Sequence, residues 1–419
     1  MNERRVVITG RGVVSCIGND VDSFWNALVD GECGIDKITQ CDASDLKTQI
    51  AGEVNDLDVT KYIPAKEARR MDRFSVFGLA ASCQAMEEAG LPNYLPDSDI
   101  VDPTRVGCVV SSGIGGLATM SDQHKKMLDK GVSKVSPFLI PSMIIDMNAG
   151  NISMRFGAQG PNLAVVTACS TATHSIGEAF WMIKRDDADV MLCGGSEASI
   201  VPLGLAGFCS MKAMSERNDD PKKASRPFDA ERDGFVMSEG AGVLILEELE
   251  HAKKRGANII AEVIGYGATG DAYHITSPHP DGDGSKRAIE MALKHAKINP
   301  SEIDYINAHG TSTPLNDKFE TMAIKSALGD HAYKVSISST KGQTGHGLGA
   351  AGALETIACT KVLETSTVPP TINYENPDPI CDLDYTPNVA KEKEVSVAMN
   401  LNLGFGGHNG ALILKKYTE

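Results

Sequence analysis

The stretch GPNLAVVTACSTATHSIGEAFWMIKR, residues 160–185, decides the predicted fold, because its hydrophobic pattern changes period at one cysteine. Before Cys169, residues 163–166 are apolar, include the β-branched pair Val165 and Val166, and follow the turn pair Gly160-Pro161, which is typical of a buried strand. After Cys169, apolar residues recur every three or four positions and predict a helix with one apolar face. They are Ala172, Ile176, Ala179, Phe180 and Ile183. This pattern places the thiol at the start of the helix.

Cys169 is a candidate nucleophile because of that position. A helix N-terminus presents unpaired backbone N–H groups and the positive end of the macrodipole, and both favour the thiolate. Stabilisation by about 2 kcal/mol would lower the pKa of the thiol by roughly 1.5 units. The alternative is that Cys169 is one more small buried residue, as most of the ten cysteines should be. Position alone leaves both interpretations open.

Strands alternate with helices along the rest of the chain, and this order predicts an α/β layered architecture. In the first half, strands are expected at residues 6–9, 106–111, 190–193 and 242–246, and helices at 21–28 and 71–90. The polar segment 218–234 predicts a long surface loop. A similar succession begins near residue 259, with strands at 259–267, 303–307, 396–403 and 411–415 and helices at 285–296 and 347–363. We therefore expect two related halves, residues 1–258 and 259–419.

Composition limits the class of protein. Hydrophobic residues make up 42% of the chain and charged residues 23%, which excludes wholesale disorder. No run of roughly 18 apolar residues is present, because Glu197 and Pro202 interrupt the nearest one, so no membrane span is expected. Arg11 breaks the apolar run near the N-terminus, so we expect no secretory signal and a cytoplasmic location.

The cysteines are scattered, without a C-x-x-C pair or clustered histidines, and predict neither disulfides nor a metal site. Residues 265–270, GYGATG, match a dinucleotide fingerprint and follow a predicted strand. However, Pro278 and Pro280 follow where that fingerprint requires a helix opening on the pyrophosphate. We therefore expect no bound cofactor.

A net charge of −15 disfavours nucleic acid as a partner. One local basic patch stands out against this charge: Lys66, Arg70 and Arg73 share a predicted helical face, with Arg69 beside it. Together with Lys212, this patch is a candidate landing site for an acidic partner protein. The alternative is an ordinary solvated helix face.

Two Gly- and Ser/Thr-rich turns after predicted strands carry ionisable groups. NAHGTSTPLNDKFE contains His309, and SISSTKGQTGHGLGAAGALE contains Lys341 and His346. Either histidine alone could be structural, but both lie at strand exits, where α/β folds build their sites, and neither belongs to an amphipathic helix face. Histidines can donate hydrogen bonds to a developing enolate while a thiolate supplies covalent catalysis. The set suits acyl transfer.

Four motifs together resemble the elongating β-ketoacyl-acyl-carrier-protein synthases. They are TACSTATHSIG around Cys169, NAHGTSTP around His309, STKGQTGHGLGAAGALE around Lys341 and His346, and GFGGHN at residues 404–409. Their order and spacing match along almost the whole chain. The resemblance implies a thiolase-like fold of two related αβαβα halves forming a five-layered core, and a homodimer. It also implies decarboxylating condensation of an acyl group with malonyl on acyl carrier protein, in fatty acid elongation.

The resemblance also implies roles for individual residues. Cys169 would hold the acyl group, with the backbone N–H groups of Cys169 and Phe405 as oxyanion hole. His309 and His346 would hold the malonyl thioester oxygen, and Lys341 and Glu355 would position them. The remaining implied positions are the binding of the phosphopantetheine arm by Thr311 and Thr313, gating by Phe405, and control of the acyl pocket by Ile114.

The second histidine of the set, His346, distinguishes this chain from related enzymes. Chain-initiating synthases and chalcone-type enzymes use Asn in its place, and degradative thiolases use a second Cys. This chain departs from the family pattern at Leu401-Asn402-Leu403, where Asn-Ser-Phe is common, which affects the expected shape of the gate. A discrete polyketide ketosynthase would share the active-site residues and stays open as an alternative. A non-catalytic chain-length partner subunit is disfavoured because it would have no use for Cys169.

Overall fold

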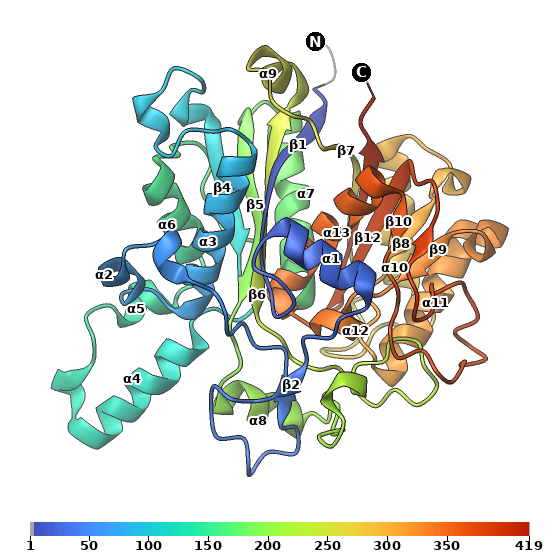
Figure 1. The fold of residues 1–419 in the computed structure, drawn as a ribbon, viewed down its shortest axis with the longest axis horizontal. Coiled ribbons are helices and arrows are strands. Elements are labelled where there is room, and N and C mark those ends of the chain that lie inside the picture. Colours follow the sequence, from blue (N-terminus) through green and yellow to red (C-terminus); the bar gives the residue numbers. More distant parts are fainter. Residues whose placement is uncertain (1–3, 419) are drawn as a thin grey trace.

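The computed structural model describes residues 4–418, which form a mixed nine-stranded sheet in the order β4-β5-β6-β1-β7-β13-β12-β8-β9 (Figure 1). The strands of this sheet are β1 (Val6–Val14), β4 (Val106–Ser111), β5 (Val190–Glu197), β6 (Gly240–Glu248), β7 (Ala261–Gly270), β8 (Tyr305–Asn307), β9 (Ser336–Ser338), β12 (Val397–Gly404) and β13 (His408–Lys416). Two short pairs accompany it: β2 (Asp36–Lys37) with β3 (Ile50–Ala51), and β10 (Thr367–Val368) with β11 (Lys391–Glu392).

The sheet has two parts that meet at β1 and β7. These strands pair antiparallel over only three residues, Val6–Ile8 with Ala261–Val263. In the first part, β4 and β5 are parallel and β5, β6 and β1 are antiparallel. In the second part, β7, β13 and β12 are antiparallel and β12, β8 and β9 are parallel. The predicted division at residue 258 coincides with this junction but stays a prediction, because the hydrogen-bonded sheet is continuous.

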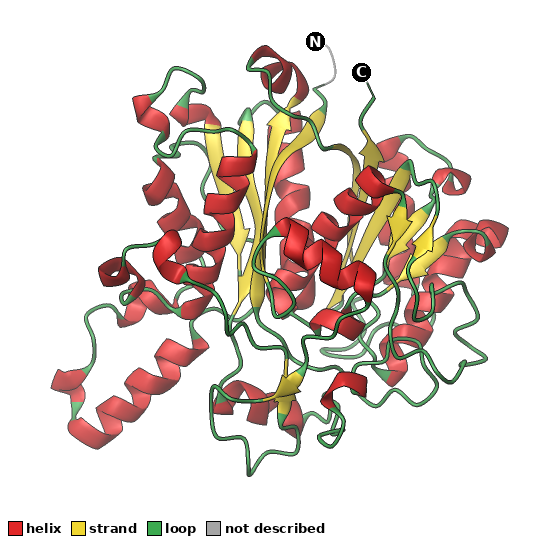
Figure 2. Cartoon of the chain, viewed as in Figure 1, coloured by secondary structure: helices red, strands yellow, loops and turns green. Residues whose placement is uncertain are grey.

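Helices form three layers around the two parts of the sheet (Figure 2). The outer helices of the first part are α3 (Arg73–Glu88) and α6 (Met147–Phe156). The central helices are α7 (Thr171–Lys184) and α13 (Ala351–Thr365), and the outer helices of the second part are α10 (Asp283–Ala296) and α11 (Pro314–Leu328). The remaining α-helices are α1 (Val21–Asp30), α2 (Ala65–Ala68), α4 (Leu117–Lys130), α5 (Leu139–Met143), α8 (Pro202–Ser210), α9 (Leu249–Lys254) and α12 (Lys341–Thr344).

Three clusters of buried apolar side chains pack these layers against one another. The largest lies between the two parts of the sheet and includes Ile176 and Ile183 of α7 with Ile357 of α13. A second joins α3 and α6 to β4, β5 and β6, and a third joins α10 and α11 to β8, β12 and β13. Three helical layers alternating with two parts of a sheet give the five-layered arrangement that the family resemblance implies. No helix within residues 4–418 is long and apolar enough to cross a membrane.

Most elements form where the period of the sequence predicts them, because local caps support them. Asp20 accepts a hydrogen bond from Ser23 N at the start of α1, and Gly31 adopts φ 72° at its end. Asp72 caps α3 through Phe74 N in the same way. These short-range contacts depend only on neighbouring residues, so the sequence predicts them well.

The predicted buried strand at residues 163–166 is wrong for this chain by itself. The segment runs beside the edge strand β4 and makes a single bridge, between Cys108 and Asn162. Beyond that bridge, Val165 N donates to the Ser111 hydroxyl at 3.0 Å instead of to a backbone carbonyl. The side chains of Leu163 and Val166 are 36% and 46% exposed. Because its backbone pairs with β4 at only one bridge, the segment forms no ladder, and Leu163 and Val166 stay uncovered.

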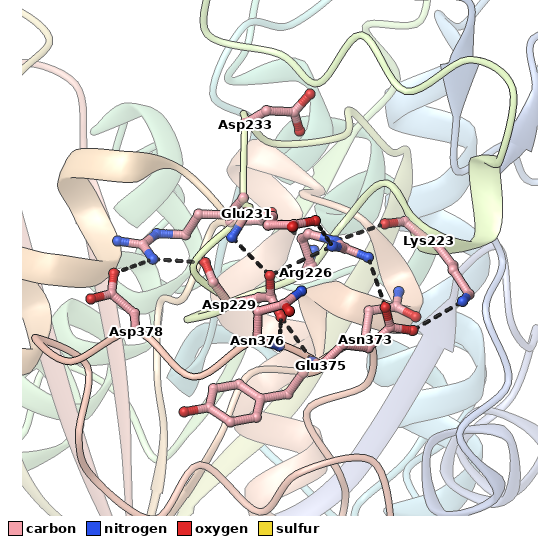
Figure 3. Close-up of polar contacts among 12 residues, drawn as sticks. Lys223, Arg226, Asp229, Glu231, Asp233, Asn373, Glu375, Asn376 and Asp378 are labelled. Atoms are coloured by element: carbon pink, nitrogen blue, oxygen red, sulfur yellow. Dashed lines mark hydrogen bonds and ion pairs between the residues drawn. The ribbon is translucent and has the colours of Figure 1, made fainter.

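The predicted surface loop at residues 218–234 is also partly wrong, because residues 224–229 are buried. Phe228 stacks on Tyr385 with ring centroids 3.9 Å apart. Figure 3 shows the polar network that allows this polar segment to be buried. The Asp229 carboxylate accepts from the backbone N–H groups of Glu375 and Asn376 at 2.8 and 2.6 Å, and Arg226 lies 3.5 Å from the same carboxyl group. Partners more than 100 positions away in the sequence cover the segment and bind its polar groups. The polarity of the segment therefore does not predict that it is exposed.

The packing of α7 against β7 gives a stability prediction. A Cβ atom at Gly177 would lie 2.3 Å from the ring of Tyr266, a buried side chain that cannot move aside freely. We expect Gly177→Ala to lower the free energy of unfolding by about 1–3 kcal/mol, measured by urea denaturation. Gly150→Ala in α6 is the matched control, because its nearest neighbour would be 3.5 Å away. Equal stability of the two variants would contradict this packing.

Candidate active site

A cavity of about 350 Å³ collects the candidate residues from distant parts of the chain. Cys169 lies before α7, His309 follows β8, and His346 follows α12. Phe405 lies in the turn between β12 and β13. Thr311, Thr313 and Lys212 complete the predicted residues that line the cavity. The nucleophile thus comes from the first half of the chain, and the histidines from the second.

The position of Cys169 agrees with the predicted helix start. A single 3-10 turn, Ala168–Ser170, precedes α7, and Ala168 adopts φ 52°. The backbone N–H groups of Phe405 and of Cys169 itself favour the thiolate form of the sulfur and so act to lower the pKa of the thiol. Such a pair of N–H groups at one point is also the arrangement that stabilises an oxyanion.

The prediction that the pKa of Cys169 is lowered is wrong for this closed site. Burial raises the pKa of the thiol to about 12, although the Lys341 ammonium and the Phe405 N–H oppose that shift. Desolvation of the thiolate therefore outweighs the helix start on which the sequence argument rested. The resting group is a thiol, so its attack on a substrate must be coupled to loss of the proton.

The two histidine rings are neutral hydrogen-bond donors. Their centroids lie 5.2 Å apart with the ring planes at 84°. Burial and the Lys341 ammonium lower the pKa of both rings well below the usual value, and the His346 ring lowers the pKa of His309 further. Leu348 N donates to Nδ1 of His346 at 3.3 Å, so the ring proton of His346 is on Nε2. A neutral imidazole with Nε2–H can hold a thioester or enolate oxygen.

Lys341 and Glu355 lie behind the histidines and are both buried. The Lys341 ammonium forms an ion pair with Glu355 and donates to the backbone carbonyl of His309 at 2.6 Å. Burial raises the pKa of Glu355, while the Lys341 ammonium and the Asn402 amide oppose this by binding its ionised form. The pair therefore holds the turn that carries His309.

Thr311 and Thr313 line the cavity wall with their hydroxyl groups 2.9 Å apart. Arg232 holds this wall, because its guanidinium donates to the carbonyl of Thr313 at 3.1 Å and to Asp378 at 2.8 Å. The Asp378 end of that contact belongs to the network in Figure 3. The buried segment that the sequence assigned to the surface thus supports the entrance to the site.

Ile114 does not line this cavity, but it packs against the apolar cluster that contains Cys169. Its turn is fixed by Glu197, whose buried carboxyl group accepts from Gly113 N at 3.0 Å and from Ser112 Oγ at 2.8 Å. The sequence interpretation of Ile114 as a residue beside the acyl group remains a prediction.

The prediction that Lys66, Arg70 and Arg73 share one helical face is wrong, because the chain forms two helices here: Lys66 lies on α2, Arg69 and Arg70 follow its end, and Arg73 begins α3. None of these four residues lines the cavity. Lys66 and Arg69 are exposed, and Arg70 stacks on Phe138 with its guanidinium carbon 5.0 Å from the ring centroid. Arg73 differs from them, because it pairs with the buried carboxylate of Glu239 at 2.7 Å. Arg73 therefore already has a structural partner.

Sequence reasoning missed two buried polar residues beside His309. Glu320 accepts from the backbone N–H groups of His309 and Gly310 at 2.6 and 2.8 Å, which fixes the turn. Asn402 lies 2.7 Å from Glu355 and 3.4 Å from His309 Nδ1. Asn402 stood out in the sequence only as part of a departure around the gate, and nothing marked Glu320.

The comparisons with known proteins agree along the whole chain. Residues 3–252 match the model of the beta-ketoacyl synthase N-terminal domain, and residues 260–375 match that of the C-terminal domain. A Synechocystis protein named 3-oxoacyl-[acyl-carrier-protein] synthase 2 is 51% identical, over 100% of this chain and 99% of its own length. A Coxiella burnetii protein of the same name is 49% identical over 100% of both chains.

Solved structures with the same fold include ketosynthases of polyketide synthesis. One belongs to a complex described as a type II PKS acyl-carrier protein with its ketosynthase bound to the hexaketide. It has a TM-score of 0.92 and 36% identity and covers 100% of both chains. The ishigamide ketosynthase/chain length factor has a TM-score of 0.91 and 34% identity, covering 99% of this chain and 100% of its own.

The lowered pKa values of the histidines predict how stability depends on pH. Below about pH 6.5, His346 binds a proton in the unfolded chain but stays neutral when it is buried in the folded protein. The free energy of unfolding therefore falls as the pH drops. The loss is up to about 1.4 kcal/mol per pH unit for this histidine. Urea unfolding between pH 7.5 and 5.5 should therefore show a shallower pH dependence for His346→Gln than for the unchanged protein. Burial raises the pKa of Glu320 to about 7, so this residue makes the folded protein more stable as the pH drops. Its effect is present in both proteins and therefore cancels when the two pH dependences are compared. Identical pH dependences would show that His346 is not buried in the neutral form.

Proposed function

Because the chain belongs to the beta-ketoacyl synthase family and is a condensing acyltransferase, we propose that it elongates acyl chains on acyl carrier protein in fatty acid synthesis. In this reaction an acyl group on Cys169 is joined to a malonyl group carried by acyl carrier protein, giving 3-oxoacyl carrier protein and CO2. The single observation that supports it best is one cavity lined by a buried thiol, two neutral imidazoles and the Phe405 turn.

The first half-reaction transfers the acyl group to Cys169. The sulfur attacks the thioester carbonyl of acyl carrier protein, and the backbone N–H groups of Cys169 and Phe405 hold the resulting oxyanion. The C–S bond to the carrier then breaks. The proton lost by the Cys169 thiol is taken up by the departing carrier thiolate, so no net charge is left in a site that disfavours a thiolate.

The second half-reaction uses the histidines. His309 and His346 donate from Nε2 to the thioester oxygen of the malonyl group, where negative charge develops as the C–C bond to CO2 breaks. The enolate carbon attacks the acyl-enzyme carbonyl, and the C–S bond to Cys169 breaks. The released thiolate takes a proton from solvent and regenerates the thiol. Thr311 and Thr313 are placed to bind the phosphopantetheine arm that delivers both substrates.

The sequence identities favour a role in fatty acid synthesis over a role as a discrete polyketide ketosynthase. The two named 3-oxoacyl synthases are 51% and 49% identical, against 36% and 34% for the polyketide-type structures, all over nearly full length. A non-catalytic chain-length subunit is disfavoured, because this chain retains Cys169 together with both N–H groups directed at its sulfur. A resident cofactor and a metal are not needed for these steps, and their absence stays a prediction, as does a cytoplasmic location.

Two exposed apolar regions support a homodimer. The segment at residues 163–166 leaves Leu163 and Val166 uncovered beside the edge strand β4. Helix α4 extends from the body of the molecule (Figure 1), and none of its side chains is buried; α4 and the segment that leads from it into α5 form an arm. Its exposed apolar residues are Met120, Leu128, Val132, Phe138 and Ile140. A second copy covering these regions would remove large apolar surfaces from water.

Ile114 supports a proposal about chain length. It is half-buried and packs against the apolar cluster that contains Cys169, without lining the main cavity. We place the acyl chain on this side of Cys169, with Ile114 controlling access. Each methylene buried in such a pocket contributes about 0.8 kcal/mol.

The two half-reactions should fail separately when different residues are changed. Cys169→Ala should abolish acylation and condensation but keep decarboxylation of malonyl carrier, since both histidines remain. His309→Ala or His346→Ala should lower decarboxylation by a factor on the order of 10² to 10³ while still permitting acylation of Cys169.

Released CO2 and labelled acyl-enzyme, measured side by side for each variant, check this division. If Cys169→Ala loses decarboxylation as completely as the histidine variants do, the two-step assignment is wrong.

Carrier docking should depend on the exposed basic residues rather than on Arg73. Reversing Lys66 and Arg69 to Glu should raise the Michaelis constant for loaded carrier at low ionic strength, and about 0.5 M salt should remove the difference by screening. Arg73 is the informative comparison, because its ion pair with Glu239 gives it a structural role. We expect Arg73→Gln to lower thermal stability and to have the smaller effect on the Michaelis constant. An unchanged Michaelis constant for the double reversal at low salt would exclude this landing site.

A further inference from the structure

Strand β12 directs two amide side chains toward the central helix α13. Asn400 and Asn402 alternate with Leu401, which lies on the opposite face of the strand in the apolar cluster of α10 and α11. Asn400 donates to the carbonyl of Gly352 at 2.9 Å and to Thr356 Oγ1 at 2.9 Å, both on α13. Asn402 instead contacts the residues behind the cavity. The two amides share a strand and a face but have different partners.

The orientation of the Asn402 amide is fixed from both ends. Thr173 of α7 donates its hydroxyl hydrogen to Oδ1 of Asn402. At the other end, Nδ2 donates to Glu355 Oε2 at 2.7 Å. Rotating the amide by half a turn would bring its oxygen against the carboxylate of Glu355 and would leave the Thr173 donor facing an N–H group. The nitrogen therefore faces Glu355 and His309.

This orientation determines which nitrogen of His309 carries the proton. Nδ2 of Asn402 lies 3.4 Å from Nδ1 of His309, and an amide nitrogen only donates. Nδ1 must then be the acceptor in this long hydrogen bond, and the single proton of the neutral ring is on Nε2. His346 is held as the same Nε2–H tautomer by the backbone N–H group of Leu348, whereas His309 depends on the side chain of Asn402.

We propose that Asn402, held by Thr173, is a positioning residue that keeps His309 as the Nε2–H tautomer and ties its ring to the Lys341–Glu355 pair. The proposal rests on the proposed function, in which Nε2 of His309 donates to the malonyl thioester oxygen. With the proton on Nδ1 instead, Nε2 would present a lone pair to a developing negative charge. Asn402 lies in the segment Leu401-Asn402-Leu403, where the sequence departs from the common Asn-Ser-Phe pattern.

The ring tautomer can be measured without substrate. In protein labelled with ¹⁵N-histidine, the His309 ring should show a protonated Nε2 and an unprotonated Nδ1, with the resonance assigned by its loss in His309→Gln. Asn402→Ala and Thr173→Val should shift this ring toward the other tautomer. Asn400→Ala should leave it unchanged, as the matched control on the same face of β12. A His309 tautomer that Asn402→Ala and Thr173→Val leave unaltered would overturn the proposal.

Activity gives a second test. Asn402→Ala should lower the decarboxylation rate about 10-fold, a size typical of residues that orient a functional histidine, while acylation of Cys169 stays within about two-fold. Thr173→Val should act in the same direction with a smaller effect, which keeps the test usable if Asn402→Ala folds poorly. In a His309→Gln background, Asn402→Ala should cause no further loss, because it acts through His309.

Two outcomes would contradict a positioning role for Asn402. One is an additive loss in the His309→Gln background, and the other is a loss of acylation as large as the loss of decarboxylation; either would indicate a general structural defect. Absence of decarboxylation and acylation in the unchanged protein would sink the proposed function alone, since the tautomer measurement does not require turnover.

Discussion

The buried charge of Lys341 is the interaction on which the candidate site depends. An ammonium group removed from water is stable only when its hydrogens are matched by acceptors, here the Glu355 carboxylate and the carbonyl of His309. These contacts join α12 to the central helix α13 and to the turn after β8. The same charge lowers the pKa of His309 and His346 and opposes the rise in the pKa of Cys169. One ion pair thus fixes geometry and protonation state together.

The site exists because two halves of the chain meet at the central layer. Cys169 reaches the cavity from the start of α7, the histidines arrive from turns of the second half, and Phe405 comes from the β12–β13 turn. Each group alone is an ordinary buried residue. Their convergence places a thiol and two neutral hydrogen-bond donors around one cavity, as the proposed division into an acyl-holding side and an enolate-stabilising side requires.

Neutrality is the common electrostatic property of the reacting groups. The thiol has a raised pKa and the imidazoles have lowered pKa values, and burial is the first cause in all three cases. A site of this kind stabilises charge only when it develops on the substrate, because the donors are already oriented and carry no charge of their own. Asn402 and Glu320 extend this preorganisation by fixing the His309 ring and its backbone turn.

The sequence by itself predicted most elements of the fold and singled out the candidate residues that the structure brings together in one cavity. Hydrophobic periods and caps depend on residues a few positions apart, so the helix after Cys169, the strand at β4 and the succession of both halves could be predicted. The tertiary structure decided what depends on distant partners. Residues 224–229 are buried by contacts with the segment near Asp378, and residues 163–166 stay uncovered at an edge. Burial reversed the expected pKa shift of Cys169, and the role of Asn402 follows from contacts with α7 and α13. Desolvation and hydrogen-bond direction are set by three-dimensional neighbours, which no local pattern of residues specifies.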